Sequence, residues 1–200
     1  MRELDALAEA VARRLFVELE ASARHVHLTA QQAQALFGHG LTPKRPLSQP
    51  GQFLCEERVI LVGPKGQLSN VAVLGPERKE AQVEISLTDG WTLGIDPPIR
   101  LSGDVKNTPG ITLEGSLGRV VLDYGVIAAQ RHIHLDPESA RRFSVRDRQV
   151  VKLQTLTRRP VIWEDVVVRV SADFAPYAHL DFDEANACGF RSGDLGRILP

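Results

Sequence analysis

Cysteine is scarce in this sequence, whose 200 residues contain two, Cys55 and Cys188, far apart along the chain. They are too few and too distant to indicate a disulfide scaffold or a paired-cysteine zinc knuckle. A reducing setting fits this usage best. We therefore expect a cytoplasmic protein.

The chain also lacks an excess of positive or negative charge. The formal net charge is -1, and the chain has no long run of Lys and Arg. Such a chain lacks the basic surface that binds a phosphodiester backbone. We therefore expect no nucleic-acid partner.

Long hydrophobic runs are absent as well. The opening MRELDALAEAVARRLFVELE is punctuated by charges, so it lacks the apolar core of a secretory signal, and no later stretch is suited to span a membrane. The 43% hydrophobic and 24% charged residues are ordinary for a soluble globular chain, which excludes disorder and a fibrous role. We expect a soluble protein without a membrane partner.

What the chain does have begins with an amphipathic pattern. Apolar side chains recur at helical spacing with charges off that stripe, which predicts an amphipathic helix as a separate segment over residues 1–22. The apolar positions are Leu4, Leu7, Ala8, Val11 and Leu15. Such a helix either packs on the adjoining domain or docks a partner such as a microcompartment shell. Because no linker follows it, packing on the domain is favoured over shell association.

A strand-and-helix unit occurs twice. The first, ARHVHLTAQQAQALFG (23–38), reads as a short strand followed by a helix that Thr29 caps. The second, QRHIHLDPESARRFSV (130–145), has Asp136 as the cap and a proline at the first helical position. The shared Arg-His-x-His-Leu stands 107 positions apart (132 minus 25), which indicates an internal repeat and two related halves.

Most of the remaining sequence is strand-like. Short β-branched runs are separated by Gly, Pro and Asp, which predicts antiparallel sheets that close into small barrels. The runs are RVILVG, SNVAVLG, AQVEISL, IRLSG, ITLEG, RVVLDYG, QVVKLQT and VIWEDVVVRVS. The predicted class is β-dominated α+β, with two small antiparallel β-barrel domains related by the repeat. They span residues 23–125 and 126–200, with short helices and the N-terminal amphipathic helix.

Four of the histidines form two His-x-His pairs on predicted strands. Side chains alternate faces along a strand, so His25 and His27 project to the same side, roughly 6–7 Å apart at the backbone, and both can reach one metal ion. Val26 between them then points into a core. The same holds for His132 and His134. One pair alone is compatible with coincidence on a solvent-facing strand, whereas the repeat favours metal sites.

Each pair needs further ligands, because a stable zinc site takes three or four. His179, in YAHLDFDEANA, is the candidate for one site. Glu84 is the candidate for the other, since it alternates with apolar Val83 and Ile85. An ordinary solvated strand glutamate is the open alternative.

Longer segments carry a resemblance to a known family. In order along nearly the whole chain, they are RHVHL, GPERKEAQVEIS, PPIRLSGD, GVIAAQRHIHLD, VVVRVS and HLDFDEANACGFRSGD. With these segments the chain resembles the PduL-type phosphotransacylases, which are phosphate propanoyltransferases. The resemblance implies two small β-barrel domains, a dinuclear zinc site between them and a helical N-terminal segment. We also expect a homo-oligomer, a dimer.

The resemblance further implies substrates and residue roles. The substrates would be phosphate and a short acyl-CoA, propanoyl-CoA or acetyl-CoA, exchanged with acyl phosphate and coenzyme A. Two Zn²⁺ ions per chain would be held by His25, His27 and Glu84 and by His132, His134 and His179. Phosphate would lie at the metals and contact Arg78, Ser102 and Gln52.

Three ligands leave a zinc ion with an open coordination position, as catalytic sites do. Phosphate held there would attack the thioester carbonyl directly, and zinc would stabilise the oxyanion. Arg78 is the expected catalytic residue that orients the phosphate. Because GPER ends six residues before Glu84, strand alternation would bring Arg78 to the same face as that ligand.

Three rival interpretations stay open. Cys188, in NACGF, is the candidate nucleophile of a covalent route, although a lone buried cysteine is more often a core residue. An open zinc site also suits a thioesterase or other hydrolase that needs no phosphate. The third is a non-catalytic, metal-binding duplicated barrel.

Overall fold

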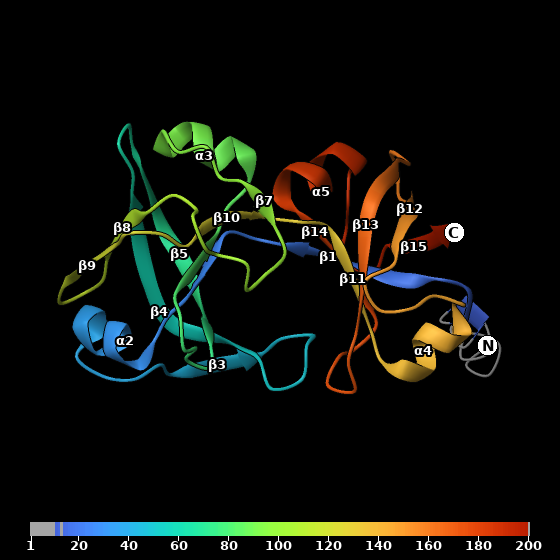
Figure 1. The fold of residues 1–200 in the computed structure, drawn as a ribbon, viewed down its shortest axis with the longest axis horizontal. Coiled ribbons are helices and arrows are strands. Elements are labelled where there is room, and N and C mark those ends of the chain that lie inside the picture. Colours follow the sequence, from blue (N-terminus) through green and yellow to red (C-terminus); the bar gives the residue numbers. More distant parts are fainter. Residues whose placement is uncertain (1–10, 13, 200) are drawn as a thin grey trace. The chain divides into compact units, whose positions relative to one another are not determined.

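The described chain divides into two compact units, most of whose elements are labelled in Figure 1. The computed structural model describes residues 11, 12 and 14–199. One unit comprises residues 23–130, and the other joins the N-terminal segment up to Ser22 to the residues from Arg131 onward. The sequence instead placed the second domain from residue 126 and set the N-terminal segment apart.

The N-terminal segment departs from its prediction. Half of the helix expected over residues 1–22 lies outside the described residues, and residues 11, 12, 14 and 15 are helical. Val17–Ser22 is strand β1, which corrects the prediction for that part. The periodicity explains it, because buried Val17 and Leu19 alternate with half-buried Glu18 and Glu20, as in a strand.

A closed barrel forms the unit that contains β1. Its other strands are β11 (His132–Leu135), β12 (Val150–Leu156), β13 (Ile162–Val170), β14 (Tyr177–Asp181) and β15 (Leu195–Leu199). Around the barrel the order is β1-β14-β11-β13-β12-β15. Two helices accompany them, α4 (Pro137–Arg142) and α5 (Phe182–Cys188).

Aliphatic side chains fill the core of this unit. Ile133, Leu153 and Val168 are fully buried there, and Cys188 belongs to the same cluster. Burial of a side chain of this size contributes roughly 1.5–3 kcal/mol. Since Ile133 points inward, its neighbours on β11 must point to the other face of the strand.

Residues 23–130 form a sheet whose strand order does not close. Its strands are β2 (His25–His27), β3 (Pro43–Pro46), β4 (Phe53–Val62), β5 (Gln67–Gly75), β6 (Gln82–Glu84), β7 (Ile99–Arg100), β8 (Ile111–Glu114), β9 (Arg119–Leu122) and β10 (Val126–Ala129). The order is β7-β10-β6-β2-β5-β4-β8-β9, with β3 beside β4. The helices of this unit are α2 (Ala30–Phe37) and α3 (Leu87–Leu93). No described helix is long and apolar enough to cross a membrane.

Two expectations about the sheets are corrected. One unit closes into a barrel, while the strand order of the other runs from β7 to β9 without closing. The strand directions are also mixed: β2 lies between parallel β5 and antiparallel β6, and β11 between parallel β13 and antiparallel β14. An alternating side-chain pattern reports a strand but not the direction of its neighbour, which depends on a crossover elsewhere in the chain.

The two strand-and-helix units form as predicted. Thr29 and Gln32 make a reciprocal capping box at α2, and Gly38 ends that helix in the left-handed conformation at φ 80°. Asp136 caps α4, and Pro137 occupies its first turn. These local predictions are confirmed.

Candidate metal centres

The first His-x-His pair meets Glu84 across neighbouring strands. β2 and β6 pair with His25 directly opposite Glu84. One ligand atom from each of His25, His27 and Glu84 lies within 4.8 Å of the others. Val26 is fully buried in the core, as the alternation predicted. With 7% of its surface exposed, Glu84 is not the solvated surface glutamate of the alternative interpretation.

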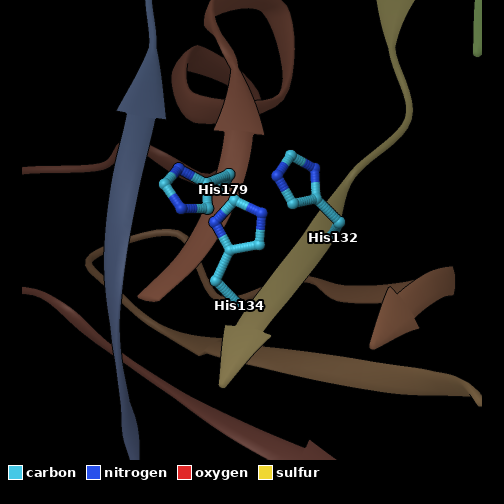
Figure 2. Close-up of side chains that lie close together, drawn as sticks. All are labelled: His132, His134 and His179. Atoms are coloured by element: carbon cyan, nitrogen blue, oxygen red, sulfur yellow. The ribbon is translucent and has the colours of Figure 1, made fainter. Parts of the chain in front are cut away.

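The second ligand set consists of three imidazoles. Figure 2 shows the rings of His132, His134 and His179 gathered together from β11 and β14. His132 lies directly opposite His179 in the pairing of these strands. The ring centroids of His132 and His134 are 4.6 Å apart, and that of His179 lies 4.9 and 4.8 Å from them. One ligand atom from each ring lies within 4.8 Å of the others.

Both ligand sets occupy the same local framework. In each unit the third ligand lies opposite the first histidine, two residues before a helix N-cap and five before the acidic member of a capping box. These positions are Glu84, Ser86 and Asp89 in one unit and His179, Asp181 and Glu184 in the other. The shared spacing can be read from the sequence, and it identifies both third ligands by pattern. It supports the internal repeat, which stays a prediction.

A partner on the far side of the ring orients one histidine in each set. Nδ1 of His25 lies 2.7 Å from the carbonyl oxygen of Ala23, and Nδ1 of His179 lies 3.3 Å from a carboxylate oxygen of Glu20. Because a carbonyl only accepts, Nδ1 of His25 must donate, which leaves Nε2 for the metal side. Glu20 comes from β1, and it was not among the predicted site residues because that segment was expected to be a helix. The alternation in VELEAS is the signal that reveals it.

The first set is electrostatically complementary only with a cation inside it. Nε2 of His25 lies 3.5 Å from a carboxylate oxygen of Glu84. Since Nδ1 already donates, Nε2 and the carboxylate would face each other as two acceptors unless a proton or a metal ion lies between them. Accordingly, although burial lowers the pKa of His25, the Glu84 carboxylate raises it, and the net pKa is above the ordinary value.

His27 is suited to ligate a metal. Burial above all, with the charges of His25 and Arg78, holds the pKa of His27 well below its ordinary value, so the ring is neutral. Its buried Nδ1 has no hydrogen-bond partner among the described residues. A neutral imidazole with an unsatisfied buried nitrogen is costly unless another group, such as a metal ion, binds it.

The donor chemistry of both sets fits zinc. Two imidazoles with one carboxylate, and three imidazoles, are the ligand sets of catalytic zinc sites, which keep a fourth position open. All six side chains are ones that the sequence predicted as ligands. The identity and number of the ions stay predictions.

The residues predicted to contact phosphate lie in loops of the unit that holds the first ligand set. Nη1 of Arg78 lies 3.4 Å from Oγ of Ser102, and the backbone N–H of Arg78 donates to the carbonyl of Leu28 at 2.8 Å. Arg78 is in the loop between β5 and β6, so strand alternation does not bring it to the site, and that argument was wrong. The loop reaches the site because it is bonded to the chain just after β2. Gln52 lies directly before β4, and its role stays a prediction.

Gln82, which was not among the predicted site residues, connects Ser102 to the first ligand set. Its Nε2 donates to Oε1 of Glu84 at 2.5 Å and to Oγ of Ser102 at 2.8 Å. Its Oε1 accepts from the backbone N–H of Gly103 at 2.7 Å. The sequence signal is slight, since a glutamine two residues before the ligand matches its alternation and nothing more.

Both cysteines lie in cores as free thiols. Burial raises the pKa of Cys188, and its Sγ donates to the carbonyl of Ala185 at 3.4 Å. Burial likewise raises the pKa of Cys55 to about 12. A buried thiol with a raised pKa supplies little of the thiolate that a nucleophile needs.

Comparisons with known proteins agree on one family. A family model of phosphate propanoyltransferases matches residues 18–191. A phosphate propanoyltransferase of Clostridioides difficile (strain 630) is 50% identical over 191 residues, which cover 94% of this chain and 91% of the relative. One of Enterococcus faecalis (strain ATCC 700802 / V583) is 53% identical over 184 residues, covering 91% and 87%. One of Thermotoga maritima (strain ATCC 43589 / DSM 3109 / JCM 10099 / NBRC 100826 / MSB8) is 50% identical over 181 residues, covering 89% and 86%. With this identity over nearly its full length, the chain belongs to the phosphate propanoyltransferase family, a family of acyltransferase enzymes.

Proposed function

We propose that this protein is a phosphate acyltransferase that interconverts a short acyl-CoA and phosphate with acyl phosphate and coenzyme A. Two zinc ions per chain are held in this proposal, one by each ligand set. The observation that carries this proposal is a chain of hydrogen bonds, within one unit, that joins a candidate metal ligand to side chains that can donate to an anion. Gln82 bonds both Glu84 and Ser102, and Ser102 adjoins the Arg78 guanidinium.

Arg78 and Ser102 bind and orient the phosphate in this proposal. A guanidinium presents several N–H donors in a plane, which suits two phosphate oxygens, and a hydroxyl adds a third donor. When bound, zinc supplies Lewis-acid stabilisation of the negative charge that develops on the thioester oxygen. Holding both substrates in place makes their encounter effectively intramolecular.

The reaction needs no nucleophile from the protein. A phosphate oxygen attacks the carbonyl carbon of the thioester, so a C–O bond forms and the C–S bond breaks. Coenzyme A leaves as the thiolate, and the acyl group remains on phosphate. The raised pKa and complete burial of Cys188 support this route over a covalent one.

The choice of acyl group is a finer question. A hydrophobic pocket distinguishes substrates that differ by one methylene by only about 1–3 kcal/mol. We propose propanoyl-CoA as a substrate, in keeping with the names of the relatives, and acetyl-CoA as a second one because it is only one methylene shorter.

One experiment separates this function from its rivals. The zinc-loaded protein is incubated with propanoyl-CoA or acetyl-CoA, with and without phosphate, while released coenzyme A thiol and trapped acyl phosphate are measured. We expect thiol release that requires phosphate and yields one acyl phosphate per thiol. Release of free acid without phosphate identifies a thioesterase. Absence of turnover with both acyl-CoAs in a protein that retains zinc supports the non-catalytic metal-binding barrel.

A further inference from the structure

Gln82 is a polar side chain in a buried place. It is 2% exposed, and it lies on β6 directly opposite His27 of β2. Side chains two positions apart on a strand share a face, so Gln82 and Glu84 point the same way. A buried amide must make its hydrogen bonds within the protein, and Gln82 makes three.

The neighbours of Gln82 fix the orientation of its amide. Nε2 faces two groups that can accept, the carboxylate of Glu84 and the hydroxyl of Ser102. Oε1 faces the backbone N–H of Gly103, which can only donate. The reverse orientation would set an oxygen against the carboxylate and an NH₂ group against an N–H group. One orientation therefore satisfies every contact.

This orientation leaves the Ser102 hydroxyl as a donor. Its Oγ accepts from Nε2 of Gln82 at 2.8 Å and lies 3.4 Å from Nη1 of Arg78. A hydroxyl has one hydrogen and two lone pairs, and here both neighbours offer hydrogens. The hydrogen of Ser102 must then point to a different acceptor, and an anion such as phosphate is one.

The same amide restrains both the ligand and the loop. Oε1 of Glu84 accepts from Gln82, which fixes the carboxylate in the way that outer hydrogen bonds fix metal ligands. The bond to Gly103 holds the loop backbone at a position where φ is +97°, a conformation that favours glycine. Gln82 thus holds both the Glu84 carboxylate and the loop at Gly103.

We propose that Gln82 is a positioning residue that holds the zinc ligand Glu84 and the phosphate donor Ser102 in register with each other. The inference rests on the proposed function, since it assumes that zinc and phosphate bind at these groups. It adds that their two affinities depend on one buried amide. A change at Gln82 therefore weakens zinc and phosphate together.

The test compares Gln82→Met, which keeps the volume but makes none of the three bonds, with Gln67→Met as the control, since Gln67 is an exposed residue of β5. Zinc release to a chelator is measured without substrates, and KM values are measured with zinc in excess. In Gln82→Met we expect about 10–100-fold weaker zinc binding for one of the two ions. We also expect a roughly threefold to tenfold higher KM for phosphate, with KM for acyl-CoA unchanged. Gln67→Met should match the wild type.

A double-mutant cycle with Ser102→Ala tests the coupling. If Gln82 acts on phosphate through the hydroxyl, Gln82→Met adds little to the KM for phosphate in the Ser102→Ala background. Full additivity overturns the inference. If Gln82→Met does not fold, Gln82→Leu answers the question, because it is smaller and likewise makes none of the three bonds.

The outcomes distinguish a failure of the role of Gln82 from a failure of the proposed function. Wild-type protein that binds no zinc or needs no phosphate overturns the proposed function. Wild-type protein that does both, with Gln82 variants that match it in zinc release and in KM for phosphate, overturns the role of Gln82 alone.

Discussion

Arg78 lies in a loop rather than in a strand. Its backbone N–H donates to the carbonyl of Leu28, directly after the first His-x-His strand, and its side chain adjoins Ser102. Its charge also lowers the pKa of His27, after the larger effects of burial and of His25, so the guanidinium is electrostatically close to that ring. In the proposed function, a residue held in this way is already in position when phosphate binds.

We expect Arg78→Lys to lower turnover and raise KM for phosphate, because an ammonium cannot present the planar fork of a guanidinium. A lost charge-assisted hydrogen bond costs about 1.5–3 kcal/mol, or roughly tenfold or more in rate. Steady-state kinetics at varied phosphate, with zinc content verified, measure the effect. Arg119→Lys, at an exposed arginine of the same unit, is the control. Unchanged phosphate dependence in Arg78→Ala would contradict the assignment.

Cys188 is expected to be dispensable for the chemistry. Cys188→Ser should retain substantial transferase activity in its folded fraction, although a hydroxyl in the apolar core lowers stability by about 1–3 kcal/mol. Activity per folded molecule and a search for an acyl adduct by mass spectrometry provide the measurements. Cys55→Ser, at the other buried cysteine, is the matched variant. An adduct on Cys188 together with lost turnover would establish a covalent mechanism instead.

The arginine that precedes each His-x-His strand joins that strand to a helix. Arg24 forms two contacts with Asp89 of α3, at 2.9 and 2.7 Å, and Nη1 of Arg131 lies 2.5 Å from Glu184 of α5. Both acids belong to capping boxes of the helix that follows the third ligand. The arginine of the repeated motif therefore ties each His-x-His strand to the helix beyond its partner strand.

We expect Arg24→Met to lower the free energy of unfolding by about 1–3 kcal/mol, because Asp89, with 5% of its side chain exposed, loses a charged partner. Arg131→Met should act similarly through Glu184. Thermal unfolding measures the loss. Lys152→Met removes an exposed pair with Glu164 and should cost little. Equal effects of Arg24→Met and Lys152→Met would contradict the role of the part-buried Arg24–Asp89 pair.

Strand β1 is an integral part of the barrel. It pairs with β14 and β15, and Leu19 is 2% exposed in the core. We expect Leu19→Ala to destabilise this unit by about 2–5 kcal/mol, whereas Glu18→Ala on the opposite strand face should change stability little. Chemical denaturation of both variants provides the comparison. A segment that only docked a partner would tolerate Leu19→Ala as well as Glu18→Ala.

At the scale of the whole molecule, two ligand sets predict two zinc ions per chain. Elemental analysis after zinc supplementation should return two, and His27→Ala and His134→Ala should each remove one. A chelator should also lower the melting temperature, because an ion that binds only the folded protein stabilises it. One ion or none in the wild type would contradict the assignment. The dimer and the cytoplasmic setting also stay predictions.

The sequence by itself determined the features that depend on neighbours within a few residues. His25 and His27 share a face because strand side chains alternate. Thr29 and Asp136 cap helices because their side chains bond backbone groups two or three residues on. The repetition of this local pattern located four of the six candidate ligands, and the sequence around His179 and Glu84 offered the other two, which the family resemblance also implied.

Only the tertiary structure decided which distant segments meet. The pattern of Val17–Ser22 does not say that it joins a barrel built from the other end of the chain, nor does the sequence reveal that β2 and β11 each have one parallel neighbour. Gln82 and Ser102 stand 20 positions apart, and Glu20 and His179 are farther still. Such contacts depend on strand register and loop closure over the whole chain, and a local pattern contains no information about either.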